Sequence, residues 1–204
     1  MSTEGVDKSK RRFLIAATTA VGGVGTAFVA YPFLAYWQPS ARAQAAGAPV
    51  EVDISKIEPG QRITVEWRGK PVWVVRRTSQ NLQDLATLGD QLRDPNSDAS
   101  VQPEYAKNPG RTIASKEQYL VVVGVCTHLG CSPLHVKEED AAAYSLGSDW
   151  KGGFFCPCHG SRFDLAGRVY KDVPAPSNLD IPPYSYITDT VIMVGVDKPK
   201  EGAV

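Results

Sequence analysis

Two short motifs, Cys126-Thr127-His128-Leu129-Gly130-Cys131 and Cys156-Pro157-Cys158-His159-Gly160-Ser161, contain all four cysteines of the chain and two of its three histidines. Each motif follows an apolar run that is typical of a strand, and each has a glycine close to its histidine, where a turn is needed. Thiolates and imidazoles are ligands of Zn²⁺ and of iron–sulfur clusters. The zinc-finger spacing, paired cysteines followed by paired histidines, is absent from the sequence. The sequence therefore predicts a metal centre built from two loops.

The paired motifs resemble those of the Rieske iron–sulfur proteins, in particular the type found in quinol–cytochrome c reductases of the bc1 class. As is general for Rieske centres, the resemblance implies a [2Fe–2S] cluster with two cysteines on one iron and two histidines on the other. These ligands would be Cys126 and Cys156 on one iron, and His128 and His159 on the other. A structural zinc site is the alternative that the donor set leaves open.

The resemblance also implies roles for the residues beside the ligands. Cys131 and Cys158 would form a disulfide that joins the two loops, as suits an exported domain. Ser161 would bind the cluster through its hydroxyl, and Leu129 would shield the cluster from solvent. His159 would contact a quinol and accept its proton, with His128 also exposed at the tip. Val173-Pro174-Ala175-Pro176 resembles the proline loop that covers the cluster.

Two positions depart from the family pattern. Val173 stands where the proline loop usually begins with Gly, so we expect a different local turn. Phe163 occupies a position that is often Tyr, whose hydroxyl bonds a ligand sulfur in relatives. Because hydrogen bonds to sulfur stabilise the reduced cluster, Phe163 is expected to lower the reduction potential.

The chain around the motifs reads mainly as β structure. Alternating apolar residues predict strands over 50–54 and 63–67, the second followed by a hairpin to 71–75, and an apolar run predicts a buried strand over 119–125. Leucines at helical spacing predict a helix over 79–92, and a proline-containing loop follows over 95–115. The expected fold is an antiparallel β-sandwich of the Rieske type with a helix–loop insertion, over residues 50–204.

The N-terminal segment predicts a single membrane span. Residues 13–37 carry no charge, and about 25 helical residues reach roughly 37 Å, enough for a bilayer core of about 30 Å. Residues 1–12 are basic, which predicts a cytoplasmic N-terminus, and Lys10-Arg11-Arg12-Phe13-Leu14 resembles a twin-arginine export signal. Ala43-Gln44-Ala45 has the pattern of a cleavage site, so a removed signal peptide is the alternative.

Residues 38–49 form an Ala-rich linker, interpreted as a hinge, with an inert spacer as the alternative. Several residues have plainer interpretations. Trp67, Trp73 and Trp150 are expected in the core, and His135 fits neither ligand position and is expected at the surface. The acidic run at 138–140 is expected to be a solvated loop, and 168–170 a strand. The tail at 198–204 is expected to fray.

The function implied by the resemblance is electron transfer from membrane quinol to a c-type cytochrome, coupled to proton release. The implied partners are cytochrome b and cytochrome c1 subunits in a dimeric complex, together with quinol and membrane lipid. The subunit is not expected to be active alone, and its head would lie in the periplasm of a bacterium. A net charge of zero gives no indication of nucleic-acid binding. The alternative is that the chain is the Rieske subunit of another exported oxidoreductase, either of the cytochrome b6f type or the small subunit of arsenite oxidase.

Overall fold

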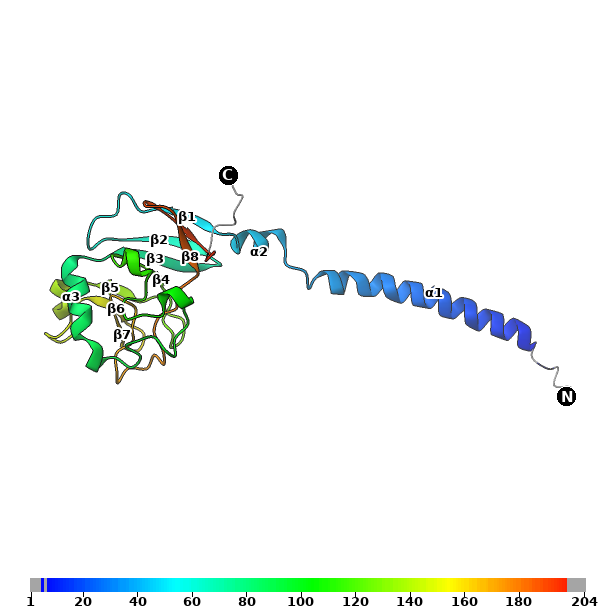
Figure 1. Ribbon diagram of the computed structural model, residues 1–204. Coiled ribbons are helices and arrows are strands. Elements are labelled where there is room, and N and C mark those ends of the chain that lie inside the picture. Colours follow the sequence, from blue (N-terminus) through cyan, green and yellow to red (C-terminus); the bar gives the residue numbers. More distant parts are fainter. Residues whose placement is uncertain (1–4, 6, 198–204) are drawn as a thin grey trace. The chain divides into compact units, whose positions relative to one another are not determined.

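The computed structural model describes residue 5 and residues 7–197, so the predicted fraying of 198–204 lies outside the described residues. The chain divides into two compact units between Ala45 and Ala46, and each is described by itself. The predicted antiparallel β fold of the larger unit is confirmed (Figure 1).

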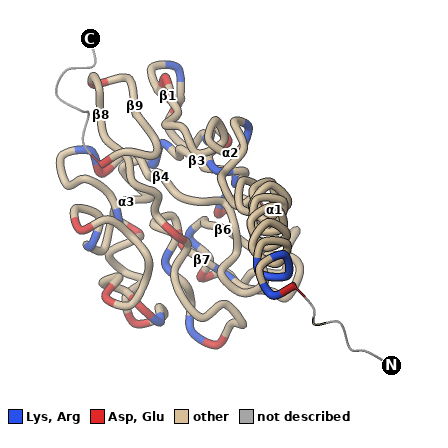
Figure 2. The backbone as a smooth tube through the Cα atoms, turned by 90° about the vertical axis from the view of Figure 1, so that its right-hand side faces the viewer, with Lys and Arg blue, Asp and Glu red and all other residues tan. Residues whose placement is uncertain are grey.

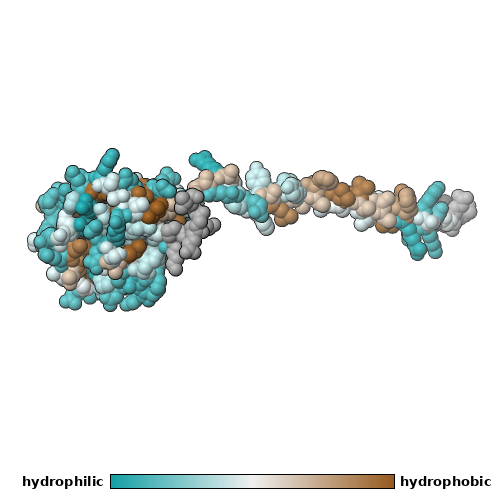
Figure 3. All heavy atoms as spheres, turned by 45° about the horizontal axis from the view of Figure 1, so that its top comes forward, coloured by the Kyte–Doolittle hydropathy of each residue, from teal (hydrophilic) through white to brown (hydrophobic). Residues whose placement is uncertain are grey.

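The N-terminal unit contains the long helix α1 (Lys8–Ala35). Asp7 caps it by accepting hydrogen bonds from the backbone amides of Ser9 and Lys10. Figure 2 shows the basic residues gathered at its first turns, and Figure 3 shows apolar side chains along the following stretch. The helix is long and apolar enough to cross a membrane. It starts before the uncharged run, because the basic residues 8–12 are good helix formers.

The predicted linker contains a short helix, α2 (Ala41–Ala46). The Ser40 hydroxyl accepts a hydrogen bond from the Ala43 amide at its start. Alanine favours this turn, and Gly47 and Pro49 follow where the helix has ended. The linker is therefore partly helical, and its role as a hinge stays a prediction.

Among the residues that the structure describes, nine strands form three antiparallel sheets of three strands each. The first sheet has the order β1-β9-β8, the second β2-β3-β4 and the third β5-β6-β7. Their bounds are β1 Val50–Asp53, β2 Arg62–Trp67, β3 Lys70–Arg76, β4 Tyr119–Val123, β5 Leu134–Val136, β6 Gly153–Cys156, β7 Ser161–Asp164, β8 Tyr184–Thr188 and β9 Val191–Val194. The second sheet contains the predicted hairpin, and β4 is buried along its whole length, as its apolar sequence predicts.

The insertion between β3 and β4 begins with helix α3 (Ser79–Thr87), which is shorter than predicted. A capping box between Thr78 and Asn81 starts it, and the chain continues as the 3₁₀ turn η1 (Gly89–Gln91). Glycine at position 89 disfavours the α-helix and explains the early end. The long loop that follows includes η2 (Glu104–Ala106) and η3 (Ala114–Lys116).

Two local predictions are corrected. The acidic run at 138–140 begins a 3₁₀ helix, η4 (Glu138–Tyr144), although its side chains are exposed as expected. The segment 168–170 is no regular strand and makes only isolated bridges, from Val169 to Phe163 and from Tyr170 to Leu92. The predicted core positions of Trp67, Trp73 and Trp150 are confirmed, with 8%, 2% and 3% of each residue exposed.

Candidate metal centre

The two cysteine–histidine motifs form a pair of similar turns in the larger unit. The first follows β4, and the second connects β6 to β7. In each turn a glycine amide donates a hydrogen bond to the carbonyl of the cysteine four residues earlier, at 3.0 Å from Gly130 to Cys126 and 2.9 Å from Gly160 to Cys156. Both glycines have left-handed backbones, with φ of 82° and 78°. The repeated spacing therefore gives the two loops the same local shape.

The four predicted ligands come together with a consistent division of burial. Cys126 and Cys156 are free thiols that are each 2% exposed, and their side chains interact with each other. His128 is half-buried and His159 is exposed, and their rings meet edge to face with centroids 4.8 Å apart. The thiols thus lie inside the domain and the imidazoles at its surface.

Burial raises the pKa of the Cys126 thiol, and this effect is larger than the opposing hydrogen bond from the His128 backbone. The thiolate is the form that binds a metal, and the metal then takes the place of the thiol proton. Two buried thiols and two imidazoles at the surface match the donor set of a Rieske [2Fe–2S] cluster. The residues present therefore fit such a cluster.

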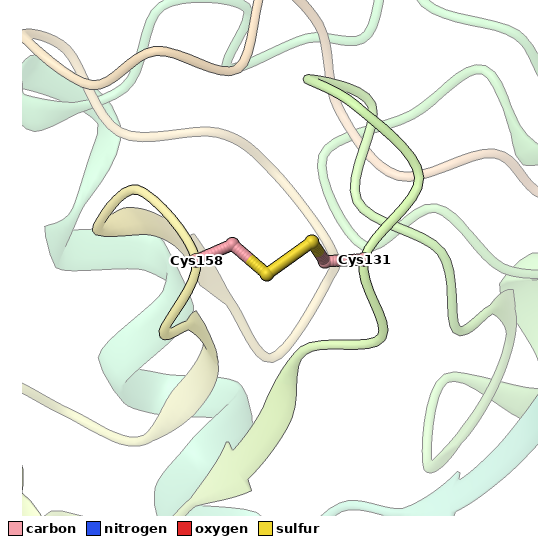
Figure 4. The surroundings of a disulfide bond; sticks show 2 residues. All are labelled: Cys131 and Cys158. Carbon is pink, nitrogen blue, oxygen red and sulfur yellow. A yellow bond between two sulfur atoms is a disulfide. The ribbon is translucent and has the colours of Figure 1, made fainter.

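A disulfide between Cys131 and Cys158 joins the two loops, which confirms the predicted pairing (Figure 4). Their Cα atoms lie 6.7 Å apart, and 27 positions of sequence separate them. The Cys156 sulfur lies within 4.8 Å of both disulfide sulfurs. The cross-link therefore holds the loops together beside a predicted ligand.

The predicted proline loop makes hydrogen bonds with both motifs. The Ala175 amide donates to the Ser161 hydroxyl at 3.1 Å, and the Thr127 hydroxyl donates to the Ser177 carbonyl at 2.7 Å. Ser161 is fully buried, and its side chain acts on the Cys126 thiol by partly opposing the rise of its pKa. Leu129, predicted to shield the cluster, is 70% exposed at the outer side of the first loop.

Sequence reasoning missed a contact from the helix–loop insertion to the proline loop. The Arg93 guanidinium donates to the carbonyls of Ala175 and Val173, at 2.7 and 3.0 Å. Both carbonyls precede prolines, and the Arg93 amide donates to Val169 at 2.9 Å. An arginine beside two X-Pro peptides is not a recognisable signal in sequence, because 80 residues separate the partners.

Val173 and Phe163, the two positions that depart from the family pattern, have defined surroundings in the structure. Asp172, immediately before Val173, takes the left-handed conformation with φ of 57°, so the valine itself avoids it. Aspartate tolerates this region better than a β-branched residue does. Phe163 is fully buried in β7, opposite Phe154 in β6.

His135 is half-buried in β5, so it is less exposed than the sequence predicts. Its ring packs against Phe154, with centroids 5.5 Å apart. Burial, followed by the charges of Arg62 and Lys137, lowers the pKa of His135 to about 4. The neutral imidazole therefore serves as a packing side chain, in agreement with its exclusion from the ligand set.

Comparisons with known proteins show what this chain is similar to. The Rieske [2Fe-2S] domain family matches residues 49–184, and the family described as "Ubiquitinol-cytochrome C reductase Fe-S subunit TAT signal" matches residues 1–40. The chain is similar to the ubiquinol-cytochrome c reductase iron-sulfur subunit of Allochromatium vinosum, with 57% identity over 97% of this chain and 94% of that protein. The corresponding subunit of Rhodospirillum rubrum is 46% identical over 95% of this chain and 96% of that protein. A chain of a solved hyperthermophilic respiratory Complex III aligns with 28% identity, 89% coverage of this chain and 98% of that one, and a TM-score of 0.45.

Proposed function

This chain belongs to the Rieske [2Fe-2S] family, as a member of the type found in bacterial ubiquinol–cytochrome c reductases, and on that premise we propose how it works. It is an electron-transfer subunit of that oxidoreductase complex, passing electrons from quinol to a c-type cytochrome. The close relatives favour this function over that of a b6f-type or arsenite oxidase subunit. The observation that carries the mechanism is the division of the donors, with thiols inside and imidazoles at the surface.

In the proposed site, Cys126 and Cys156 would ligate one iron of the cluster, and His128 and His159 would ligate the other. When bound, the cluster supplies a one-electron acceptor of raised potential, because imidazoles replace two anionic thiolates. The burial of the cysteines keeps water from the sulfur ligands. Ser161 supports the site through the hydroxyl that meets the Cys126 sulfur.

The exposed side of the site is where substrate would arrive. His159 is exposed, so we propose that it contacts the quinol hydroxyl. Its second ring nitrogen, the one that does not bind iron, would accept the quinol proton. The neighbouring Leu129 presents an exposed apolar side chain, which suits contact with an apolar quinol or partner surface. His128 lies against His159 and would complete this exposed edge.

The N-terminal unit makes the chain a single-pass, membrane-anchored subunit. We propose that residues 1–12 lie in the cytoplasm, that 13–37 cross the bacterial inner membrane and that 50–204 form a periplasmic head. The cluster of basic residues before the apolar stretch supports this orientation. Residues 38–49 would act as the hinge between the membrane and the head. Cytochrome b and cytochrome c1 would complete a dimeric complex, without which the subunit is inactive.

The three histidines provide a test of the ligand set in the complex purified from membranes. We expect His128→Gln and His159→Gln to abolish the electron paramagnetic resonance signal of a reduced Rieske cluster. His135→Gln is the matched control and should retain the signal, because this side chain packs against Phe154. Wild-type complex should contain b and c1 haem and reduce cytochrome c with quinol. Loss of the signal in the His135 variant alone, or a wild-type preparation without the signal, would refute the proposal.

A further inference from the structure

The Trp73 indole lies between the two sheets that carry the cluster loops. Trp73 belongs to β3 in the second sheet, and its ring stacks on Phe154 of β6 in the third sheet, with centroids 5.1 Å apart. The Arg62 guanidinium lies 4.4 Å above the same ring, and Trp73 is only 2% exposed. The indole therefore contacts both a cation and an aromatic ring, which favour one position for it.

The same indole leaves no room for a side chain at position 124. A Cβ atom built on Gly124 would lie 2.7 Å or less from three atoms of the Trp73 ring system. The Gly124 backbone needs no left-handed conformation, so glycine is required here by space alone. Its amide donates to the Pro71 carbonyl at 2.8 Å, which holds the backbone against β3.

Gly124 and Phe154, which both lie against the indole, hold equivalent places before the two motifs. Gly124 precedes Cys126 by two positions, and Phe154 precedes Cys156 by two positions. Within the described residues, no strand pairing joins β4 to β6, because they belong to separate sheets. The spacing between the bases of the two loops is therefore set by side-chain packing, while the disulfide between Cys131 and Cys158 joins the loops farther along.

We propose that Trp73 is a positioning residue for the cluster. Its indole fills the space between the end of β4 and β6 and so holds Cys126 and Cys156 at the separation that a cluster requires. The inference rests on the proposed function, because it assigns the residue a role toward the [2Fe–2S] group. The alternative is that Trp73 only contributes to the stability of the core.

A second buried tryptophan provides the matched control. Trp67 is 8% exposed and lies in β2 of the same sheet as Trp73. It packs near Gly195 and Pro49, at the β1–β9 side of the head. Trp67→Leu and Trp73→Leu therefore remove similar side chains from the same core. Of the two residues, only Trp73 lies behind the predicted ligands.

The first experiment compares these variants in the complex purified from membranes. Both should lower the unfolding temperature of the head, measured by circular dichroism. Only Trp73→Leu should change the g values of the reduced cluster, its midpoint potential and the iron content per chain. In Trp73→Phe, which keeps an aromatic ring at this position, all three should stay close to their wild-type values. If Trp73→Leu lowers the unfolding temperature but leaves the spectrum, potential and iron content as in wild type, the positioning role is refuted.

The second experiment uses the steric relation between Gly124 and Trp73. Gly124→Ala overfills a packed site, so we expect cluster content per chain to fall roughly fivefold or more. Gly89→Ala is the control, because a Cβ there meets nothing within 4 Å. The double variant Gly124→Ala with Trp73→Leu should regain cluster content, since the leucine leaves room for the new methyl group.

A double variant no better than Gly124→Ala would contradict the proposal even if Trp73→Leu folds poorly. The outcomes also separate this inference from the proposed function. If the wild-type complex has a Rieske spectrum and the Trp73 variants have wild-type spectra, potentials and iron contents, only the positioning role is refuted. A wild-type complex without that spectrum refutes the proposed function, and the positioning role falls with it.

Discussion

Substituting Phe163 by tyrosine places a hydroxyl group beside the sulfur ligands. Phe163 and Ser161 are alternate residues of β7, so their side chains lie on the same face of the strand. The Ser161 side chain acts on the Cys126 thiol by lowering its pKa, and Phe163 lies one step along that face with no exposed surface. A tyrosine hydroxyl at this position is therefore expected to donate a hydrogen bond to a ligand sulfur.

The size of the effect follows from the strength of one hydrogen bond. A bond worth about 0.5–1.5 kcal/mol more in the reduced state raises a one-electron potential by about 20–60 mV. The sign is positive, because a donor stabilises the extra negative charge of the reduced cluster. If the hydroxyl found no partner in this closed site, the protein would instead lose about 1–3 kcal/mol of stability.

The assay is protein-film voltammetry of the purified head or complex, together with thermal unfolding. Phe155→Tyr is the matched control, since Phe155 is half-buried and alternates with Phe154 and Cys156 along β6. We expect Phe163→Tyr to raise the midpoint potential and Phe155→Tyr to leave it unchanged. A potential that stays equal or falls in Phe163→Tyr would refute the reasoning.

Three further outcomes are expected. Because burial lowers the pKa of His135 to about 4 from 6.5, the unfolded chain binds a proton that the folded chain does not, and stability should fall as pH drops through this window. Urea unfolding of His135→Phe should show a flatter loss between those values, and an identical loss would contradict this. Asp164→Asn should lower the free energy of unfolding by about 3–5 kcal/mol, because the buried Arg168 loses a carboxylate 2.7 Å away. Asp189→Asn, which breaks a pair with an exposed carboxylate, should lower it by at most about 1 kcal/mol. Equal losses in denaturant unfolding of these two variants would argue against it. Replacing Cys131 and Cys158 by serine should make the cluster signal decay before circular dichroism reports unfolding, and a wild-type decay rate would remove the disulfide's stabilising role.

The chemistry of the site was predictable because its donors are close together in sequence. A Cys–His pair within each motif, followed by a glycine, defines the turn, its ligand types and the similarity of the two loops. The membrane helix was predictable for a similar reason, since a long uncharged run has few alternatives. The antiparallel β fold followed from short alternating segments and the family resemblance.

Element ends and side-chain environments were less predictable. The helix over 79–92 ends early because Gly89 disfavours it, while Leu88 and Leu92 are buried on either side of a 3₁₀ turn. His135 lies between the exposed Leu134 and the buried Val136, and the pairing of β5 with β6 places it against Phe154. Neither outcome can be read from a local pattern, because both depend on what packs against the segment.

The sequence by itself determined which atoms can bind iron, which segment can cross a membrane and which family pattern the chain follows. Only the tertiary structure decided that the thiols are buried while the imidazoles are at the surface. It also decided that Arg93 holds the proline loop and that the Trp73 indole lies behind both motifs. The physical reason is that ligand chemistry belongs to single side chains at short spacing, whereas burial and separation arise from packing between segments far apart in the chain.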